Sequence, residues 1–134
     1  METLPIFVYG TLQRGEIRES CWPHPADRIL WATVRGTLYD LGPHPALTAG
    51  EMEVRGELWF VPTDGMTETL RVLDTIEGFA QPGKPDWYQR HVVLAQADDG
   101  NAYQAFAYYY ARLDELNEAT VVLPSEMGVC HWRS

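Results

Sequence analysis

Hydrophobic and polar positions along the chain predict several strands and one helix. Between Met66 and Phe79, apolar residues recur at the spacing of one helical face, which predicts an amphipathic helix. Elsewhere, runs rich in β-branched and aromatic residues predict strands. These strands cover Pro5–Tyr9, Ile29–Leu41, Glu51–Val61, Trp87–Ala97 and Tyr103–Ala111. We expect the last two to form a hairpin around a turn at residues 98–101.

One helix, many strands and hairpin-like connections are typical of an α+β fold with a barrel-like sheet. We therefore predict a single α+β domain over residues 1–134, built on a small, mostly antiparallel β-barrel with one main helix. Gly36 should bend its strand. Leu113–Val122 fits no single pattern, and Pro124–Ser134 is predicted to be irregular, with Trp132 packed as an anchor.

Glu77 interrupts the apolar face of the predicted helix. That face runs through Met66, Leu70 and Leu73. Gly78 is a typical residue just past a helix end, so Glu77 would lie in the last turn, where the helix dipole disfavours negative charge. Burial and the dipole both raise the pKa of a carboxyl group, and a pKa near neutrality suits a general acid/base. The alternative is a frayed last turn, with Glu77 bent out into water.

Composition narrows the classes of function. The chain has 134 residues, 46% of them hydrophobic, and a formal net charge of −9. This charge argues against nucleic acid or an anionic membrane as a partner, and no apolar run is long enough for a membrane-spanning helix. Met1–Pro5 lacks the features of a signal peptide, so we predict a cytoplasmic protein whose partner is a small molecule. The oligomeric state stays open.

Cysteine and histidine positions do not support a metal site. Cys21 and Cys130 are expected to be free thiols in a reducing cytosol. With His24 and His131 they would supply four zinc ligands, but Cys130 and His131 are adjacent, which is rare in structural zinc sites. No glycine-rich nucleotide-binding motif follows the first predicted strand. We therefore predict no metal and no cofactor.

The segment Tyr9-Gly10-Thr11-Leu12 follows the first predicted strand. A glycine there lets the chain turn sharply, so that successive backbone amides can face one anion, as in oxyanion holes. Taken alone, this segment is more often an ordinary tight turn into an irregular stretch. The turn becomes more informative when it is considered together with a set of other segments. The set consists of Val8–Gly15, Leu38–Asp40, Pro45–Leu47, Leu73–Gly78, Tyr88–Arg90 and Tyr108.

In this order and spacing, the set resembles the γ-glutamylcyclotransferase-like superfamily, particularly its small γ-glutamylamine cyclotransferase and avirulence-induced-gene-like members. The resemblance covers nearly the whole chain. It implies a compact mixed barrel in which the turn and the helix end face one cavity, with Glu77 at the catalytic position. It also implies conversion of γ-glutamyl amines or γ-glutamyl amino acids to 5-oxoproline without metal or cofactor. The implied substrate-binding residues are Tyr9, Gly10, Thr11, Leu12, Tyr88 and Tyr108.

The chemistry implied by the resemblance gives each residue a role. Glu77 would move a proton from the attacking α-amine to the leaving amine. Backbone amides of residues 10–12 would stabilise the oxyanion, and Tyr9 would shape the pocket. Tyr88 and Tyr108 would supply phenolic hydrogen bonds to the substrate. Alternatively, Tyr88 only packs against a neighbouring strand. Tyr108 is one of three successive tyrosines, which cannot all face one pocket, so it too has packing as an alternative role.

Other observations leave the function partly open. Arg90 should face the same side of its strand as Tyr88, and we expect it to form a structural salt bridge, with Asp74 or Glu77 as the partner; the alternative is a solvated side chain. Relatives often have a Pro-Asn pair after the glycine-rich stretch, where this chain continues with Gly15-Glu16-Ile17-Arg18, so the leaving group stays undefined. Two alternative functions are removal of a γ-glutamyl group in a biosynthetic pathway and non-catalytic binding of a carboxylate or other small ligand.

Overall fold

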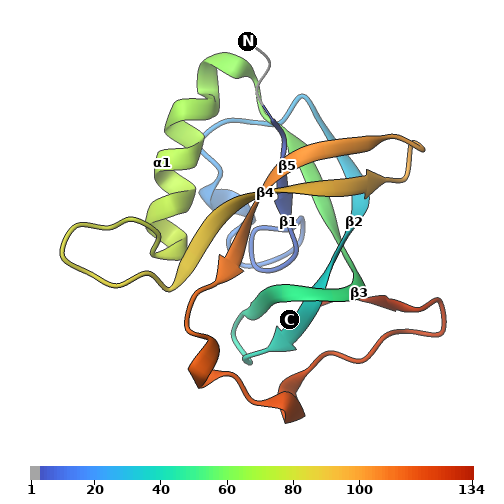
Figure 1. Cartoon of the computed structure of the whole chain (residues 1–134). Helices are drawn as coiled ribbons and strands as arrows, with labels where there is room; N and C mark the ends of the chain where they lie inside the picture. The colour runs from blue at the N-terminus through green and yellow to red at the C-terminus, as the bar shows by residue number, and fades with distance from the viewer. Residues whose placement is uncertain (1–3) are drawn as a thin grey trace.

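The computed structural model describes residues 4–134 and consists of a β-barrel with one long helix beside it (Figure 1). Its strands are β1 (Ile6–Val8), β2 (Arg28–Asp40), β3 (Pro45–Phe60), β4 (Tyr88–Ala97), β5 (Ala102–Tyr110) and β6 (Val129–Cys130). The α-helix is α1 (Met66–Glu77). Short 3-10 turns are η1 (Glu19–Cys21), η2 (Thr63–Gly65), η3 (Leu113–Glu115) and η4 (Glu118–Thr120).

The barrel closes because β1 pairs with a strand on each side. The strand order is β1-β5-β4-β2-β3-β6, and an additional pairing of β1 with β3 joins the ends of a five-stranded barrel. β1 is parallel to β5 and β6 is parallel to β3, whereas the remaining pairs are antiparallel. These pairings confirm the predicted α+β fold with a small, mixed, mostly antiparallel barrel and one main helix.

Most predicted elements lie within a few residues of the observed ones. β4 and β5 form the predicted hairpin, and the register of β2 against β3 shifts between Gly36 and Thr37, where the bend was expected. β3 is longer than predicted, because it already begins at Pro45. Proline is tolerated at the first position of a strand, where its missing N–H costs no ladder hydrogen bond.

The C-terminal part is more ordered than the sequence predicted. Val121 forms an isolated bridge with Tyr39, within the segment that fits no single pattern. In the tail, Val129 and Cys130 form β6 and pair with β3. Trp132 is 3% exposed, which confirms its predicted packing as an anchor.

Small side chains fill the interior of the barrel along β4 and β5. The interior residues of this hairpin include four alanines that are at most 4% exposed, and the ring of Phe7 from β1 belongs to the same cluster. The alanines are Ala95, Ala97, Ala105 and Ala107. Interiors of small barrels are filled by side chains.

Helix α1 packs its apolar face on the outside of the barrel. Met66 and Leu73 are buried there with Ile6 and Val8, the outward-facing residues of β1. Gly78 ends the helix in the left-handed conformation, with φ of 66°, and its N–H donates to helical carbonyl groups. The last helical turn is therefore closed by a cap, as the sequence predicted, and is not frayed.

No helix within residues 4–134 has both the length and the apolar character needed to cross a membrane. The predicted cytoplasmic location rests partly on residues 1–3, which lie outside the described residues, and it stays a prediction. The organisation of residues 1–134 as a single domain likewise stays a prediction.

Candidate active site

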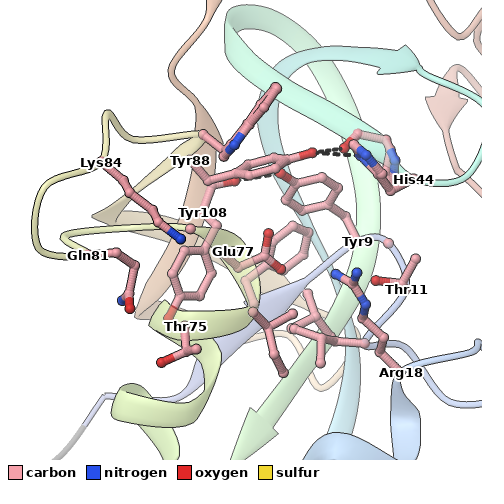
Figure 2. A pocket seen from close by; sticks show the side chains of 18 residues that line it. Tyr9, Thr11, Arg18, His44, Thr75, Glu77, Gln81, Lys84, Tyr88 and Tyr108 are labelled. Carbon is pink, nitrogen blue, oxygen red and sulfur yellow. Dashed lines mark hydrogen bonds between the residues drawn. The ribbon is translucent and has the colours of Figure 1, made fainter.

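A cavity of about 460 Å³ lies between the turn after β1, the C-terminal end of α1 and the facing ends of β4 and β5 (Figure 2). It brings together segments that are far apart in the sequence. All the predicted site residues line it, namely Tyr9, Gly10, Thr11, Leu12, Glu77, Tyr88 and Tyr108. The other lining residues are Phe7, Val8, Arg18, His44, Pro45, Thr75, Ile76, Gly78, Gln81, Lys84 and Trp87.

Glu77 extends from the last turn of α1 into this cavity (Figure 2). Within residues 4–134 its carboxyl group has neither a hydrogen bond nor an ion pair. Burial raises its pKa to about 7, and the positive charge of Arg18 opposes part of that rise. Both protonation states are therefore populated near neutral pH, which a group that accepts and returns a proton requires.

In the turn after β1, carbonyl groups accept hydrogen bonds from backbone amides later in the same loop. The Gly10 carbonyl accepts from the backbone N of Gln13 at 3.1 Å, and the Thr11 carbonyl accepts from the backbone N of Arg18 at 2.8 Å. In contrast, the amides of residues 10–12 donate none of the loop hydrogen bonds found within residues 4–134. Buried amides normally have acceptors, so this turn is suited to an anionic oxygen in the cavity.

Gly10 is required here by close packing. A Cβ atom at this position would lie 2.7 Å from the Cδ and Cγ atoms of Pro45, which is too close for real contacts. Pro45 begins β3 and also lines the cavity. The glycine therefore lets the turn approach β3 and form one wall of the cavity.

A fully buried glutamate holds the next part of this loop. Glu57 of β3 is 0% exposed, and its carboxylate accepts from the backbone N and Nε of Arg14, at 2.9 and 2.8 Å. It also accepts from Nε1 of Trp59 at 3.1 Å, and that ring stacks on Trp22 with 4.1 Å between ring centroids. These contacts attach the loop after β1 to β3 at two points, Arg14 and Trp22.

The C-terminal segment fastens the same loop from another direction. Nε2 of Gln13 donates to the carbonyl of Trp132 at 3.1 Å, and Nη1 of Arg133 donates to the carbonyl of Arg14 at 2.7 Å. Nε1 of Trp132 in turn donates to Asp40 at 3.1 Å. The loop after β1 is thus bonded directly to the C-terminal segment.

The hydroxyl groups of Tyr88 and Tyr108 already donate to the protein. Tyr88 donates to the carbonyl of Pro45 at 2.7 Å, and Tyr108 donates to Oδ1 of Asp74 at 2.6 Å. A phenol has one hydrogen, so the 2.9 Å contact between the Tyr88 oxygen and Nδ1 of His44 requires the histidine to donate. In this arrangement both tyrosines can offer a substrate only an acceptor, and their hydrogen bonds to substrate stay a prediction.

The helix end that carries Glu77 is anchored by a salt bridge. Arg90 of β4 donates from Nε and Nη2 to the two carboxylate oxygens of Asp74, at 3.0 and 3.1 Å, which confirms the predicted salt bridge and identifies Asp74 as the partner. Through Tyr108, the same carboxylate is bonded to β5. The three elements that form this side of the cavity are therefore linked at one aspartate.

Sequence reasoning did not assign a role to Arg18, His44 or Lys84 in the cavity. Arg18 lies in the segment that departs from the family pattern, and Lys84 lies in the loop after α1. Neither position follows a strand or helix period, so no pattern connected them to Glu77. Only the folded chain brings these charges together.

The structure also places the cysteines among the candidate zinc ligands. Cys21 and Cys130 are free thiols, the first exposed and the second buried. Within residues 4–134, no group of three or more His, Cys, Asp or Glu side chains is arranged to hold a metal ion.

Residues 6–132 match the family described as gamma-glutamyl cyclotransferase, AIG2-like, and the chain belongs to this family. A Vibrio cholerae protein provisionally named a gamma-glutamylcyclotransferase is 37% identical over 73 residues, which cover 54% of this chain and 60% of that protein. The gamma-L-glutamyl-butirosin B gamma-glutamyl cyclotransferase of Niallia circulans is 29% identical over 112 residues, covering 83% of this chain and 69% of the relative. The matched part of the chain thus falls short of the full length of both curated relatives.

Solved structures agree with this assignment. An AIG2-like protein from mouse aligns with a TM-score of 0.64 and 25% identity over 100% of this chain and 98% of its own. A protein from Arabidopsis thaliana aligns with a TM-score of 0.61 and 21% identity, covering 86% of this chain and 66% of that chain, and supports the fold alone.

Proposed function

We propose that this protein is a γ-glutamyl cyclotransferase that converts γ-glutamyl amines or γ-glutamyl amino acids to 5-oxoproline and a free amine. The observation that carries this proposal is the carboxyl group of Glu77, which has a pKa of about 7 and no protein partner within residues 4–134. It faces the same cavity as the turn whose amides donate none of the loop hydrogen bonds in the described part of the chain. Membership of the family supports the same activity.

The proposed reaction moves one proton between two nitrogen atoms of the substrate. As the neutral α-amine attacks the γ-carbonyl carbon, the new C–N bond forms and ionised Glu77 accepts a proton from that nitrogen. When the tetrahedral intermediate collapses, the bond to the leaving nitrogen breaks and protonated Glu77 donates to it. The products are 5-oxoproline and the amine, and the carboxylate is restored without any redox change or added reactant. A group that acts first as base and then as acid works best with a pKa near the working pH.

The turn after β1 would stabilise the charge that develops during this reaction. The carbonyl oxygen becomes an oxyanion when the α-nitrogen adds, and amides of Gly10, Thr11 and Leu12 are the donors available in the cavity wall. Because the ring closure is intramolecular, the remaining task is to hold the folded substrate with the amine against the carbonyl. A cavity of about 460 Å³ is of the size that small ligands occupy.

The test is release of 5-oxoproline from γ-glutamyl amino acids, γ-glutamyl amines and γ-glutamyl-ε-lysine. We expect Glu77→Gln to lower kcat by about 10²-fold to 10⁴-fold, the usual contribution of general acid/base catalysis. Glu68→Gln, an exposed position on the same helix, is the matched control and should keep wild-type turnover. Normal turnover by Glu77→Gln would refute the assigned mechanism. If wild type binds 5-oxoproline but turns over no member of the panel, the protein is a binding module.

A second candidate function is removal of a γ-glutamyl group from a larger biosynthetic product. It is favoured by the Niallia circulans relative, whose name gives γ-glutamyl-butirosin B as its substrate. The two functions share the chemistry at Glu77 and differ in the leaving group. Faster turnover of a γ-glutamylated aminoglycoside than of γ-glutamyl-alanine would select the second.

A further inference from the structure

Arg18 differs from the other arginines in its bonding. Each of the others donates a hydrogen bond or forms an ion pair with a carboxylate, a carbonyl or a hydroxyl group. The guanidinium group of Arg18 does neither within residues 4–134. It is partly buried and extends toward Glu77 from the side of the turn after β1 (Figure 2). Its donors therefore face the cavity with no acceptor among the residues that the structure describes.

The backbone of Arg18 is fixed to the turn that it adjoins. Its N–H donates to the Thr11 carbonyl at 2.8 Å, and its own carbonyl accepts from the backbone N of Cys21 at 3.0 Å. The guanidinium group is thus presented from an ordered segment beside the amides of residues 10–12. Such preorganisation lowers the entropy cost of binding a ligand.

Glu77 neutralises the charge of Arg18 only in part. Burial raises the pKa of this glutamate to about 7 in spite of the nearby positive charge, so a substantial fraction of the carboxyl group is neutral near pH 7. The other cation in the cavity wall is Lys84, whose side chain belongs to the exposed loop after α1 (Figure 2). In a chain with a formal net charge of −9, this cavity therefore carries a local excess of positive charge.

We propose that Arg18 binds the α-carboxylate of the γ-glutamyl group, an inference that rests on the proposed function. A guanidinium group forms paired, charge-assisted hydrogen bonds with a carboxylate. The α-carboxylate and the attacking α-amine are attached to the same carbon, so holding the first at Arg18 brings the second toward Glu77. Every γ-glutamyl substrate carries this α-carboxylate. A constant group of this kind suits a cation whose backbone is fixed to the turn after β1.

Arg71 lies outside the cavity wall and serves as the matched control. It is exposed on α1, and its contact with Glu68 is an exposed ion pair with 4.0 Å between the charged atoms. An exposed pair of this kind contributes little to stability. We expect Arg71→Gln to change kcat/KM by less than about fivefold, whether or not the substrate carries an α-carboxylate.

The decisive experiment combines a change in the protein with a change in the substrate. Release of 5-oxoproline or its carboxamide would be measured for wild type and Arg18→Gln, with γ-glutamyl-alanine and with its analogue in which the γ-glutamyl α-carboxylate is an amide. Each single change should lower kcat/KM by about tenfold to about 150-fold, the range for hydrogen bonds to charged groups. Both changes together should cost little more than one, because each removes the same interaction. Arg18→Lys should recover part of the loss.

The combined experiment also separates the contact between Arg18 and the substrate carboxylate from the effect of Arg18 on the pKa of Glu77. A change in the pKa of Glu77 acts on both substrates alike and cancels in the comparison, whereas loss of the carboxylate contact does not. If the losses in kcat/KM from the protein change and from the substrate change multiply, Arg18 does not bind the α-carboxylate. Wild-type kcat/KM for Arg18→Gln would also overturn this role. Circular dichroism checks that the variants are folded.

Failure of the proposed function would be distinguishable from failure of this inference. Absence of turnover by wild type on every γ-glutamyl compound refutes the function, and the carboxylate contact is then measured by calorimetric binding of 5-oxoproline. Weaker binding to Arg18→Gln than to Arg71→Gln supports the contact. Equal binding to the two variants overturns it.

Discussion

Two glutamates lie near the loop after β1, and their surroundings differ in nearly every respect. Glu57 is completely buried and accepts hydrogen bonds from the backbone and side chain of Arg14 and from Trp59. Glu77 borders the cavity and has no hydrogen bond or ion pair within residues 4–134. One carboxylate thus fastens the loop to the barrel, while the other faces the space where a substrate would bind.

The difference shows that partners, more than burial, decide what a carboxyl group does in this protein. Donors that surround Glu57 compensate its removal from water, so its charge is used to hold structure. At Glu77 burial is not compensated by donors, and the raised pKa leaves a proton that can be exchanged. The same residue type therefore fixes the loop at one site and is available for chemistry at the other.

The largest effect on stability is expected from Glu57→Ala. Removing this carboxylate leaves the donors of Trp59 and of the Arg14 backbone without their acceptor, so we expect a loss of about 4 kcal/mol in the free energy of unfolding. Urea denaturation would measure it. Glu53→Ala, an exposed position on the same strand, is the control and should change stability by less than about 0.5 kcal/mol. Equal losses of unfolding free energy in the two variants would contradict the structural role assigned to Glu57.

The opposite sign is expected for Glu77→Gln. In the unfolded chain this carboxyl ionises near its ordinary pKa of 4.5, whereas the folded protein keeps the proton until about pH 7. The unfolded state therefore binds fewer protons between these values, and wild type loses stability there as pH rises. Relative to wild type, Glu77→Gln should gain up to about 3 kcal/mol between pH 4.5 and 7. A constant stability difference from pH 4 to 8 would show that Glu77 is not perturbed.

A smaller effect is expected from Tyr108→Phe, which removes the hydrogen bond to Asp74 but leaves the Arg90 salt bridge in place. We expect a loss of about 1 kcal/mol in the free energy of unfolding. The loss should appear in urea titrations and be accompanied by lower kcat, because Asp74 helps hold the end of α1. Tyr109→Phe is the control, since its hydroxyl has no hydrogen bond within residues 4–134. If Tyr109→Phe costs as much, the bond to Asp74 contributes nothing specific.

The smallest effect concerns the pH dependence of turnover. We expect kcat/KM of wild type to rise as Glu77 ionises, with an inflection near pH 7. Arg18 lowers the pKa of Glu77, so Arg18→Gln should move this inflection to higher pH. Initial rates between pH 5 and 9 would reveal the shift, and Lys84→Gln is the comparison. An inflection that moves downward would contradict the electrostatic coupling.

The sequence predicted Glu77 but not Glu57, and the reason is the face on which each lies. Glu77 interrupts an apolar helical face, so the pattern itself marks it. Glu57 lies on the face of β3 opposite to Val54 and Leu58, which point into the barrel, and alternation assigns such a position to solvent. The loop that carries Arg14, together with Trp22, covers that face in the folded protein. No local pattern contains this tertiary contact.

The fold itself was predictable because its main strands are long and its helix is strongly periodic. The parts that were missed are short or depend on distant partners. A strand of two residues such as β6 carries no measurable period, and the early start of β3 at Pro45 depends on pairing with Asp40. Arg18 is in the same class, since its position in the cavity is set by the turn to which its backbone is bonded.

The fastening of the loop after β1 by the C-terminal segment has a consequence for protein synthesis. Gln13 and Trp132 are separated by 119 residues, which a ribosome needs on the order of ten seconds to add. During that interval β1, its turn and the contacts to Glu57 can form, but the C-terminal contacts to the loop cannot. A nascent chain whose residues 129–134 are still inside the exit tunnel therefore has an incompletely fastened turn.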